Sequence, residues 1–298
     1  GGVSASAIPA DWPHAEASAQ ISAGGLVWHV QRFGSGPPVL LVHGTAASTH
    51  SFRDLAPRLA EDFDVVAIDL PGHGFSSALD APTLPRVSDG LSALLARIGV
   101  RPALAVGHSA GAAVALRMAV DGLIAPRAVI GLAPALKPYG GAADGLASNL
   151  AKLTFLNPLT LRLISMRAES RRVGRLIAKT GSRLDADGVD YYVRLMKRSD
   201  HIQGALRLMA HWKLRPLLDD LPYLNVPARF IVGETDYATP PRDAEAAARR
   251  IRDGRIERLA GLGHLAHEED PEAAADHIRA AAREVGLMTP APSRAASG

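Results

Sequence analysis

A serine between two glycines is the feature of this sequence best suited to covalent chemistry. Residues 107–111 read Gly-His-Ser-Ala-Gly and place Ser109 directly after the apolar run 103–106 and directly before the alanine-rich run 112–119. The first run predicts a buried strand and the second a helix. A serine in the tight turn between them can present its hydroxyl to a substrate, and the flanking glycines allow close packing. We interpret Ser109 as a nucleophile; the alternative is an ordinary glycine-rich turn.

This serine needs two partners, because its hydroxyl is a weak nucleophile until an imidazole takes its proton and a carboxylate orients that imidazole. Asp236 follows the apolar run 228–232, and His264 follows a Gly-x-Gly at 261–263. The order serine, aspartate, histidine is that of the α/β-hydrolase triad, whereas chymotrypsin and subtilisin use other orders. We therefore assign Asp236 as the acid and His264 as the general base.

Each partner has an alternative nearby in the chain. For Asp236, the alternatives are a solvated turn aspartate or the N-cap of a helix opening near Pro240, and Glu234 is the second candidate acid. For the base, the competitor is His267. The glycines before His264 suit a tight loop that presents its side chain at the sheet edge, so His267 is interpreted as a packed histidine.

The amides that would stabilise a developing oxyanion come from two segments. The apolar run 38–42 predicts a strand, and His-Gly-Thr-Ala-Ala follows it at 43–47. In α/β-hydrolases an N–H of this loop acts together with the N–H of the residue after the nucleophile. This points to the backbone N–H groups of Thr45 and Ala110, and one such donor typically contributes about 3 kcal/mol. His43 is interpreted as a structural residue that braces the loop.

A further motif, Asp-x-x-Gly-His-Gly, follows the apolar run 64–68 and predicts turns anchored by Asp69 and His73. Its two glycines do not make a dinucleotide-binding fingerprint, and the sequence has no P-loop, so nucleotide hydrolysis has no support. Taken with the motifs above, it resembles the α/β-hydrolase superfamily over about residues 25–285. The resemblance implies an α/β-hydrolase fold with a serine, aspartate and histidine triad.

Within that superfamily, the sequence resembles the BchO-like accessory proteins of magnesium chelatase. The motifs that carry this resemblance are Trp-Pro-His at 12–14, the tryptophan-containing segment 25–31, the extended loop 43–51 and the serine motif 107–113. The resemblance implies a context in tetrapyrrole metabolism, specifically bacteriochlorophyll biosynthesis, and magnesium chelatase as a partner. The composition of the chain itself does not indicate a tetrapyrrole.

Strand and helix patterns alternate around the site residues up to about residue 133, which predicts a mostly parallel, doubly wound sheet with helices on both faces. The pattern stops at 134–221, where helical signals occur without a credible buried strand. Many α/β-hydrolases carry a helical cap at this place, so we expect a core of residues 1–133 and 222–288 with a cap of residues 134–221. Residues 289–298 read as a disordered tail.

Positive charge is concentrated in the expected cap. Residues 134–221 contain fifteen Lys or Arg and eight Asp or Glu, whereas the rest of the chain contains eighteen and twenty-two. The segment 150–167 and the arginines that follow it mix apolar and basic residues, which suits an anionic membrane surface or the mouth of a lipophilic pocket. The alternative is a cap helix whose bases face solvent. Nucleic-acid binding is not expected, since no recognition motif accompanies the bases.

The composition fits one catalytic unit of 298 residues, with 47% hydrophobic residues and no cysteine. The absence of cysteine excludes disulfides, thiolate metal sites and a cysteine nucleophile. No metal-ligand cluster stands out, and we expect no cofactor. We see neither a signal-peptide pattern nor an apolar run long enough to span a membrane, so we expect a cytoplasmic protein, with peripheral contact to the inner or photosynthetic membrane left open.

Two functional hypotheses follow from these patterns. The first is a serine hydrolase that cleaves an ester of a hydrophobic substrate in a tetrapyrrole context. Because the residue between the glycines is serine rather than aspartate, haloalkane dehalogenase and epoxide hydrolase chemistry are disfavoured. The second is an accessory protein of magnesium chelatase that binds a porphyrin, a partner protein or a membrane without essential hydrolysis. The fold alone does not decide between them.

Overall fold

The computed structural model of the chain describes residues 5–137 and 168–289. Its strands form one eight-stranded sheet in the spatial order β1-β2-β4-β3-β5-β6-β7-β8. The strands are β1 (Ser18–Ala23), β2 (Leu26–Phe33), β3 (Pro38–Val42), β4 (Asp64–Ile68), β5 (Leu104–His108), β6 (Ala128–Leu132), β7 (Ala228–Gly233) and β8 (Gly254–Leu259). Strands β3 to β8 pair in parallel, and β2 pairs antiparallel with both β1 and β4. The prediction of a mostly parallel sheet is confirmed.

Buried apolar runs identified the central strands, and polar edge strands were not predicted. The runs at 38–42 and 64–68 are strands β3 and β4 over the same residues, and every residue of β4 is buried. Strand β8 alternates exposed and half-buried residues and carries three charged side chains, so it has no apolar run that would mark it. Strand β1, at the other edge, is likewise largely exposed.

Helices cover both faces of the sheet. Helices α1 (Leu55–Leu59) and α12 (Pro271–Glu284) pack on one face. Helices α2 (Leu84–Arg97), α3 (Ala110–Val120), α9 (Arg215–Asp220) and α10 (Pro241–Ala248) pack on the other. The remaining helices are η1 (Ala15–Ala17), η2 (Thr49–Phe52), α6 (Ser170–Lys179), α7 (Ala186–Met196), α8 (Ser199–His211), η3 (Leu221–Tyr223) and α11 (Ala266–Glu269).

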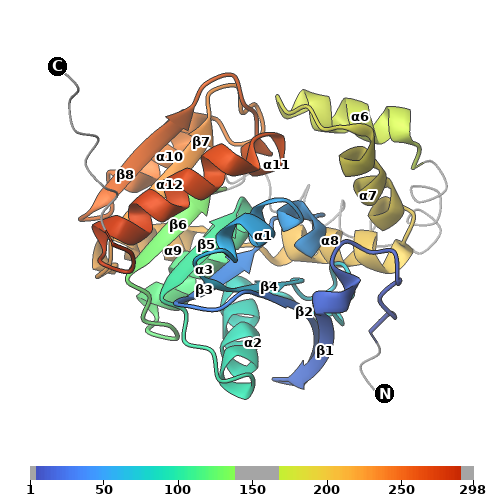
Figure 1. Cartoon of the computed structure of the whole chain (residues 1–298), viewed down its shortest axis with the longest axis horizontal. Helices are drawn as coiled ribbons and strands as arrows, with labels where there is room; N and C mark the ends of the chain where they lie inside the picture. Colours follow the sequence, from blue (N-terminus) through green and yellow to red (C-terminus); the bar gives the residue numbers. More distant parts are fainter. Residues whose placement is uncertain (1–4, 138–167, 290–298) are drawn as a thin grey trace.

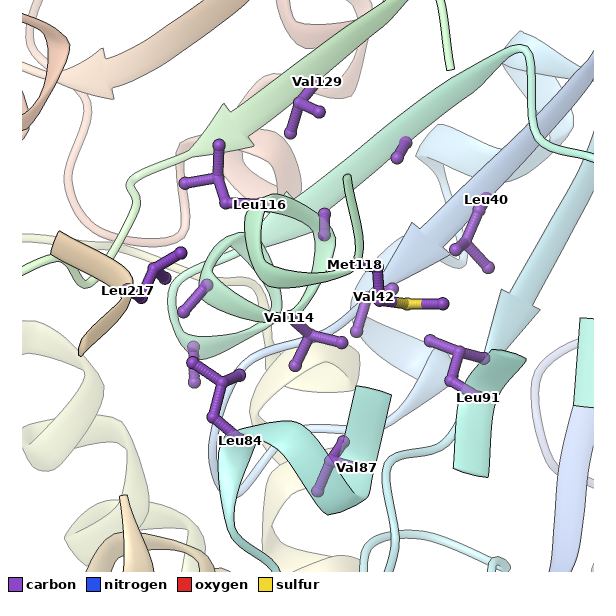
Figure 2. Packing of buried hydrophobic residues seen from close by; sticks show 14 of the residues in the cluster. Leu40, Val42, Leu84, Val87, Leu91, Val114, Leu116, Met118, Val129 and Leu217 are labelled. Atoms are coloured by element: carbon purple, nitrogen blue, oxygen red, sulfur yellow. The ribbon is translucent and has the colours of Figure 1, made fainter. Parts of the chain in front are cut away.

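The two faces follow from the period of two along each strand, since successive side chains of a strand point to opposite sides. In β3, Leu40 and Val42 belong to the core under α2 and α3, whereas Val39 and Leu41 belong to the core under α1 and α12. Figure 2 shows the first of these cores, in which side chains of α2 and α3 lie against those of β3. The central strands are therefore apolar on both sides, as expected for buried parallel strands.

Polar caps fix where several helices begin. The hydroxyl of Thr83 accepts a hydrogen bond from the Arg86 amide at the start of α2. Helix α7 begins after Asp185, whose carboxylate accepts from the Gly188 amide at 2.7 Å. Such side chains satisfy amides that lack an intrahelical partner, and each typically contributes about 1 kcal/mol.

Between β6 and β7, the described residues form helices α6 to α9 and no strand. In Figure 1, α6 and α7 form a pair on the side of the molecule opposite β8. None of the described helices is both long enough and apolar enough to span a bilayer. The mixed apolar and basic segment 150–167 and nearly all of the expected tail 289–298 lie outside the described residues, so those two predictions are not tested here.

The α3 core provides a test of the packing. Leu116 is fully buried beneath the sheet, so replacing it with alanine leaves a cavity and should lower the free energy of unfolding by about 2–5 kcal/mol in urea denaturation. The control is Leu176→Ala, because Leu176 is 52% exposed and should change stability by less than about 0.5 kcal/mol. Equal effects of the two substitutions would contradict the assigned core.

Candidate active site

Ser109 occupies a strained turn at the junction of β5 and α3. Its φ of 52° and ψ of −115° are rarely adopted by a residue with a side chain. Its amide donates to the carbonyl of Leu132 at 2.9 Å, and its own carbonyl accepts from the amide of Ala135 at 3.1 Å. These bonds to the chain after β6 hold the turn, and the Ser109 side chain remains partly exposed. Strain kept in place by its surroundings is typical of functional positions.

The glycines around Ser109 are required by close backbone approach. A Cβ on Gly107 would lie 2.3 Å from the carbonyl carbon of Gly111, and one on Gly111 would lie 2.1 Å from the Val42 oxygen. A Cβ on Gly44 would lie 2.9 Å from the Cβ of Ser109. Helix α3 is thereby packed tightly onto β5 and β3, and the loop after β3 lies directly against the serine.

Asp236 and His264 form a hydrogen-bonded pair in the loops that follow β7 and β8. The Nδ1 of His264 lies 2.9 Å from Oδ2 of Asp236, and Asp236 is almost completely buried. A carboxylate only accepts, so Nδ1 carries the proton and Nε2 keeps a free lone pair. The other carboxylate oxygen accepts from the amides of Ala238 and Thr239, each at 2.8 Å. Asp236 is therefore a buried turn residue. Its Oδ1 accepts from the amides of the turn, and its Oδ2 accepts from His264.

Thr239 joins this pair, and it was missed in the sequence. Its hydroxyl lies 2.7 Å from Asp236 Oδ2, 3.1 Å from His264 Nδ1 and 3.2 Å from the carbonyl oxygen of Ala133. It thus connects Asp236 and His264 to the chain after β6. The signal for it was the Asp-x-x-Thr spacing directly after a strand, a pattern in which the two side chains share one turn.

His264 contacts His108, the residue that directly precedes Ser109. The two imidazole rings lie 4.8 Å apart, and His108 Nε2 donates to the His264 carbonyl oxygen at 3.1 Å. Among the described residues, the hydrogen bonds of the His264 ring are made by Nδ1 alone. No direct hydrogen bond joins Ser109 to His264 in this part of the chain. Catalytic hydrogen bonds are often long without substrate and tighten when it binds.

The two alternative residues lie elsewhere. Glu234 is exposed and lies outside the Asp236–His264 pair. His267 is buried, and its Nε2 lies 2.9 Å from the hydroxyl of Ser51. That hydroxyl donates to Glu268 at 2.6 Å, so it accepts from His267. His267 is thus a packed histidine with a different partner.

The two amides predicted as oxyanion donors belong to Thr45, in the loop after β3, and to Ala110, at the start of α3. Within the described residues, neither backbone amide donates a hydrogen bond. Ala110 is the first residue of α3, where amides lack an intrahelical acceptor. The next residue of the loop, Ala46, has a φ of 64°. His43 braces the loop, because its Nδ1 donates to the Gly44 oxygen and its Nε2 accepts from the Leu70 amide.

Asp69 ties the neighbouring loops together, as its motif predicted. It accepts from the amides of Thr49 and Phe75 and lies 2.6 Å from Nδ1 of His29. Burial acts to raise the pKa of Asp69, but the neighbouring His29 and His43 and the amide of Phe75 outweigh burial and lower it. Among the described residues, no three His, Cys, Asp or Glu side chains are grouped as a metal site.

Comparison with known proteins identifies the family of this chain. The chain matches the alpha/beta hydrolase family over residues 39–277 and belongs to that family. It is 40% identical over 270 residues to a protein of Rhodobacter capsulatus named "Magnesium-chelatase 30 kDa subunit". That match covers 88% of this chain and 93% of the relative. The resemblance seen in the motifs, both to the superfamily and to the magnesium chelatase accessory proteins, is confirmed.

Two further similarities are informative. A pimeloyl-[acyl-carrier protein] methyl ester esterase of Neisseria meningitidis serogroup B is 29% identical over 251 residues, covering 78% of this chain and 88% of the esterase. Among solved structures, an alpha/beta hydrolase fold protein from Burkholderia ambifaria superposes with a TM-score of 0.72 at 26% identity. That superposition covers 88% of this chain and 98% of the Burkholderia protein.

The burial of His267 predicts acid sensitivity. Burial, with smaller contributions from His264 and Arg53, lowers the pKa of His267 from the ordinary 6.5 to about 3. The unfolded chain therefore binds a proton at this residue below pH 6.5 that the folded chain does not bind. Stability is full above pH 6.5 and is lost as the pH falls toward 3, by about 2 kcal/mol between pH 7 and pH 5.

Urea denaturation at pH 7 and pH 5 measures this loss. In the His267→Gln variant, which cannot titrate at this position, the decrease between the two pH values should be smaller than in the wild type by about 2 kcal/mol. The comparison uses each protein's own difference, so a lower stability of the variant at pH 7 does not affect it. An identical decrease in both proteins would show that His267 is not buried in its neutral form.

Proposed function

We propose that this α/β-hydrolase is a serine hydrolase that cleaves an ester of a hydrophobic substrate. Ser109 is the nucleophile, His264 the general base and Asp236 the orienting acid, and the amides of Thr45 and Ala110 bind the oxyanion. One observation carries the proposal. The buried Asp236 holds Nδ1 of His264, which leaves Nε2 of the neutral ring with a free lone pair. The ring of His264 lies 4.8 Å from that of His108, the residue that directly precedes Ser109 in its strained strand-to-helix turn.

The chemistry follows from these roles. The Ser109 hydroxyl attacks the ester carbonyl while Nε2 of His264 takes its proton, and the carbonyl oxygen becomes an oxyanion facing the two amides. The imidazolium, stabilised by Asp236, then gives the proton to the departing alcohol, which leaves an acyl-serine. A water molecule attacks this acyl group by the same route and releases the acid. Thr239, whose hydroxyl lies close to both Asp236 and His264, holds the acid and the base in position relative to each other.

The substrate class is argued from the relatives. One is named a magnesium-chelatase subunit and another a methyl ester esterase. We place the substrate among hydrophobic esters of a tetrapyrrole context, which would reconcile the two names. The names support this class without identifying a compound.

A second candidate function is that of an accessory protein of magnesium chelatase, which binds a porphyrin or the chelatase without essential hydrolysis. The name of the Rhodobacter capsulatus relative favours it. The two functions differ in one measurable property, because a nucleophilic serine is needed for hydrolysis and not for binding.

A further part of this proposal concerns the insertion between β6 and β7. We assign residues 134–221 as a cap, with a core of residues 1–133 and 222–288. Within the described part, helix α6 presents four basic residues to solvent, together with the half-exposed Leu176. The basic residues are Arg171, Arg172, Arg175 and Lys179. Basic helices with exposed apolar residues bind anionic bilayers, so this face supports peripheral contact with a membrane.

Covalent labelling tests the nucleophile. A fluorophosphonate should modify the wild type at Ser109 alone, and Ser109→Ala should lose labelling while keeping its circular dichroism spectrum. His264→Gln and Asp236→Asn should each slow labelling about 10³-fold or more, because they remove the base or its orientation. The labelled residue is identified by mass spectrometry of the digested protein.

Matched variants serve as controls for the acid and the base. Glu234→Gln and His267→Gln change the same residue types close by in the chain and should keep most of the labelling rate. Unchanged labelling of Ser109→Ala would overturn the serine hydrolase and favour the accessory function. A reversed ranking of the two histidines would move the base to His267.

Vesicle co-sedimentation tests the basic face of α6. The wild type should bind vesicles of phosphatidylglycerol at low salt and lose binding as salt rises, because exposed charges are screened beyond about 10 Å near 0.1 M ionic strength. Reversing the charges of Arg171, Arg172 and Arg175 to glutamate should remove most of the binding, since each base contributes about 1 kcal/mol near an anionic surface.

The control for charge reversal is a second triple variant on another exposed surface. Arg249, Arg250 and Arg252 lie near the end of α10, outside the insertion, and are exposed. Changing them to glutamate alters the net charge by the same amount and should leave most of the vesicle binding. No binding of the wild type at low salt would mean that α6 is a solvated helix with no membrane role.

A further inference from the structure

The connector between α6 and α7 passes between the two loops that carry Asp236 and His264. A Cβ on Gly181 of this connector would lie 1.8 Å from the carbonyl oxygen of Thr235. On the other side, a Cβ on Gly263 would lie 2.3 Å from the carbonyl carbon of Gly181. Glycine is needed at both positions, because the inserted chain packs backbone against backbone with the residues next to the acid and the base.

Hydrogen bonds fix this connector to both loops. The carbonyl oxygen of Thr180 accepts from the amides of Tyr237 and His264, at 3.1 and 3.4 Å. The Oγ of Ser182, which is fully buried, accepts from the Leu265 amide at 2.7 Å. The backbone on both sides of the His264 Cα is therefore bonded to the insertion. Among the described residues, the bond to the Leu265 amide is the one hydrogen bond between the Ser182 side chain and the loop after β8 that carries His264, called the histidine loop.

A second residue of the insertion is hydrogen-bonded to the loop after β3, which carries Thr45 and is called the oxyanion loop. His201, in α8, accepts from the Gly74 amide through Nδ1 at 3.0 Å. Its Nε2 must then carry the proton, and it donates to the carbonyl oxygen of Ala46 at 3.2 Å. Burial lowers the pKa of His201 to about 4, so the ring is neutral at pH 7 and keeps this arrangement. Ala46 directly follows Thr45 and has the left-handed φ noted above.

We propose that Ser182 and His201 are positioning residues of the active site, Ser182 for the base and His201 for the oxyanion amide of Thr45. The proposal rests on the serine hydrolase function proposed above. According to this proposal, the insertion holds catalytic groups in position, because it is attached to the loops that carry the base and the oxyanion donor. Neither residue touches the reacting atoms.

Two different outcomes would follow from loss of these contacts. Without Ser182, the Leu265 amide loses its buried acceptor and the His264 backbone can shift relative to Asp236. Without His201, both the Ala46 carbonyl and the Gly74 amide lose their partners, and the peptide that orients the Thr45 amide is released. A displacement near 1 Å at a catalytic group can lower the rate about 10²-fold.

The Ser182 contact is tested by comparing Ser182→Ala with Thr180→Ala. Both substitutions remove one hydroxyl from the connector, but the Thr180 hydroxyl donates to the carbonyl of Ile177 at the end of α6 and, among the described residues, makes no hydrogen bond to the loop of His264. The Thr180 carbonyl that binds this loop is retained in Thr180→Ala. Ser182→Ala should slow fluorophosphonate labelling of Ser109 about 10- to 100-fold, and Thr180→Ala should change it less than about threefold.

A spectroscopic measurement makes this test independent of catalysis. The proton between His264 Nδ1 and Asp236 should give a low-field proton resonance in the wild type, and this resonance should shift or broaden in Ser182→Ala and remain in Thr180→Ala. If the wild type is not labelled at Ser109, the proposed function fails, and this resonance still decides the role of Ser182. Equal labelling rates and an unchanged resonance in both variants would overturn that role.

The His201 contact is tested by comparing His201→Leu with His211→Leu. Both histidines lie in α8, but the His211 ring is bonded to the carbonyl of Arg207 in the same helix. With a soluble p-nitrophenyl ester, His201→Leu should lower kcat about 10- to 100-fold with KM little changed, as expected for a group that stabilises only the transition state. His211→Leu should leave both constants near wild type.

Rescue and exchange measurements complete the test. His201→Gln retains an amide nitrogen that can donate to Ala46, so it should recover part of the lost kcat, and it serves as the second variant if His201→Leu does not fold. Amide hydrogen exchange of residues 43–47 should accelerate in His201→Leu and not in His211→Leu. A fall in kcat equal to that of His211→Leu, or unchanged exchange of this loop, would overturn the role of His201.

Discussion

The backbone of Ser109 is the constraint on which the site depends. A residue with a side chain is held in a conformation usually left to glycine, and this is possible because Gly107 and Gly111 allow α3 to lie directly on β5 and β3. The same packing sets the first amide of α3 beside the loop that contains Gly44. One tight turn therefore fixes the backbone of Ser109 and the amide of Ala110, and it lies directly against the loop that carries the amide of Thr45. The turn is held by parallel strands that are buried on both sides, so its strain is supported by the core.

The other functional groups assemble at the same edge of the sheet, because parallel strands end there together. Asp236 follows β7 and His264 follows β8, and each is fixed by hydrogen bonds to backbone as well as to the other. Around them lie several buried histidines whose pKa values are lowered by burial. These rings act as neutral donors and acceptors that join loops. The site is thus a network of hydrogen bonds between loops that are anchored on buried apolar strands. These bonds limit how far any of the loops can move.

Membership of the alpha/beta hydrolase family establishes the fold and leaves the reaction to be argued from the site. We favour a serine hydrolase, since a buried carboxylate that orients an imidazole, together with a strained serine at a strand-to-helix turn, suits hydrolysis better than binding alone. The relative named as a magnesium-chelatase subunit adds a context. A hydrolase and an accessory role are compatible, because an enzyme acting on a hydrophobic ester can also associate with the proteins that make or use it. The contacts of the insertion with the catalytic loops would make such an association able to affect the chemistry.

The sequence by itself determined the central strands, the strand-to-helix turn at Ser109 and the choice of Asp236 and His264, because these depend on local apolar periodicity, glycine spacing and chain order. It did not reveal the edge strand β8, because three of its six residues are charged and only Leu259 among them is buried. It also missed Thr239, although the Asp-x-x-Thr spacing was a local signal for it. It could not reveal Ser182 and His201, since their partners are 83 and 155 residues away in the chain and only folding brings them together. The tertiary structure alone decided that His267 pairs with Ser51 and that the insertion contacts the loops that carry His264 and Thr45. Local patterns fix element types, whereas polar contacts between distant loops depend on how the elements pack.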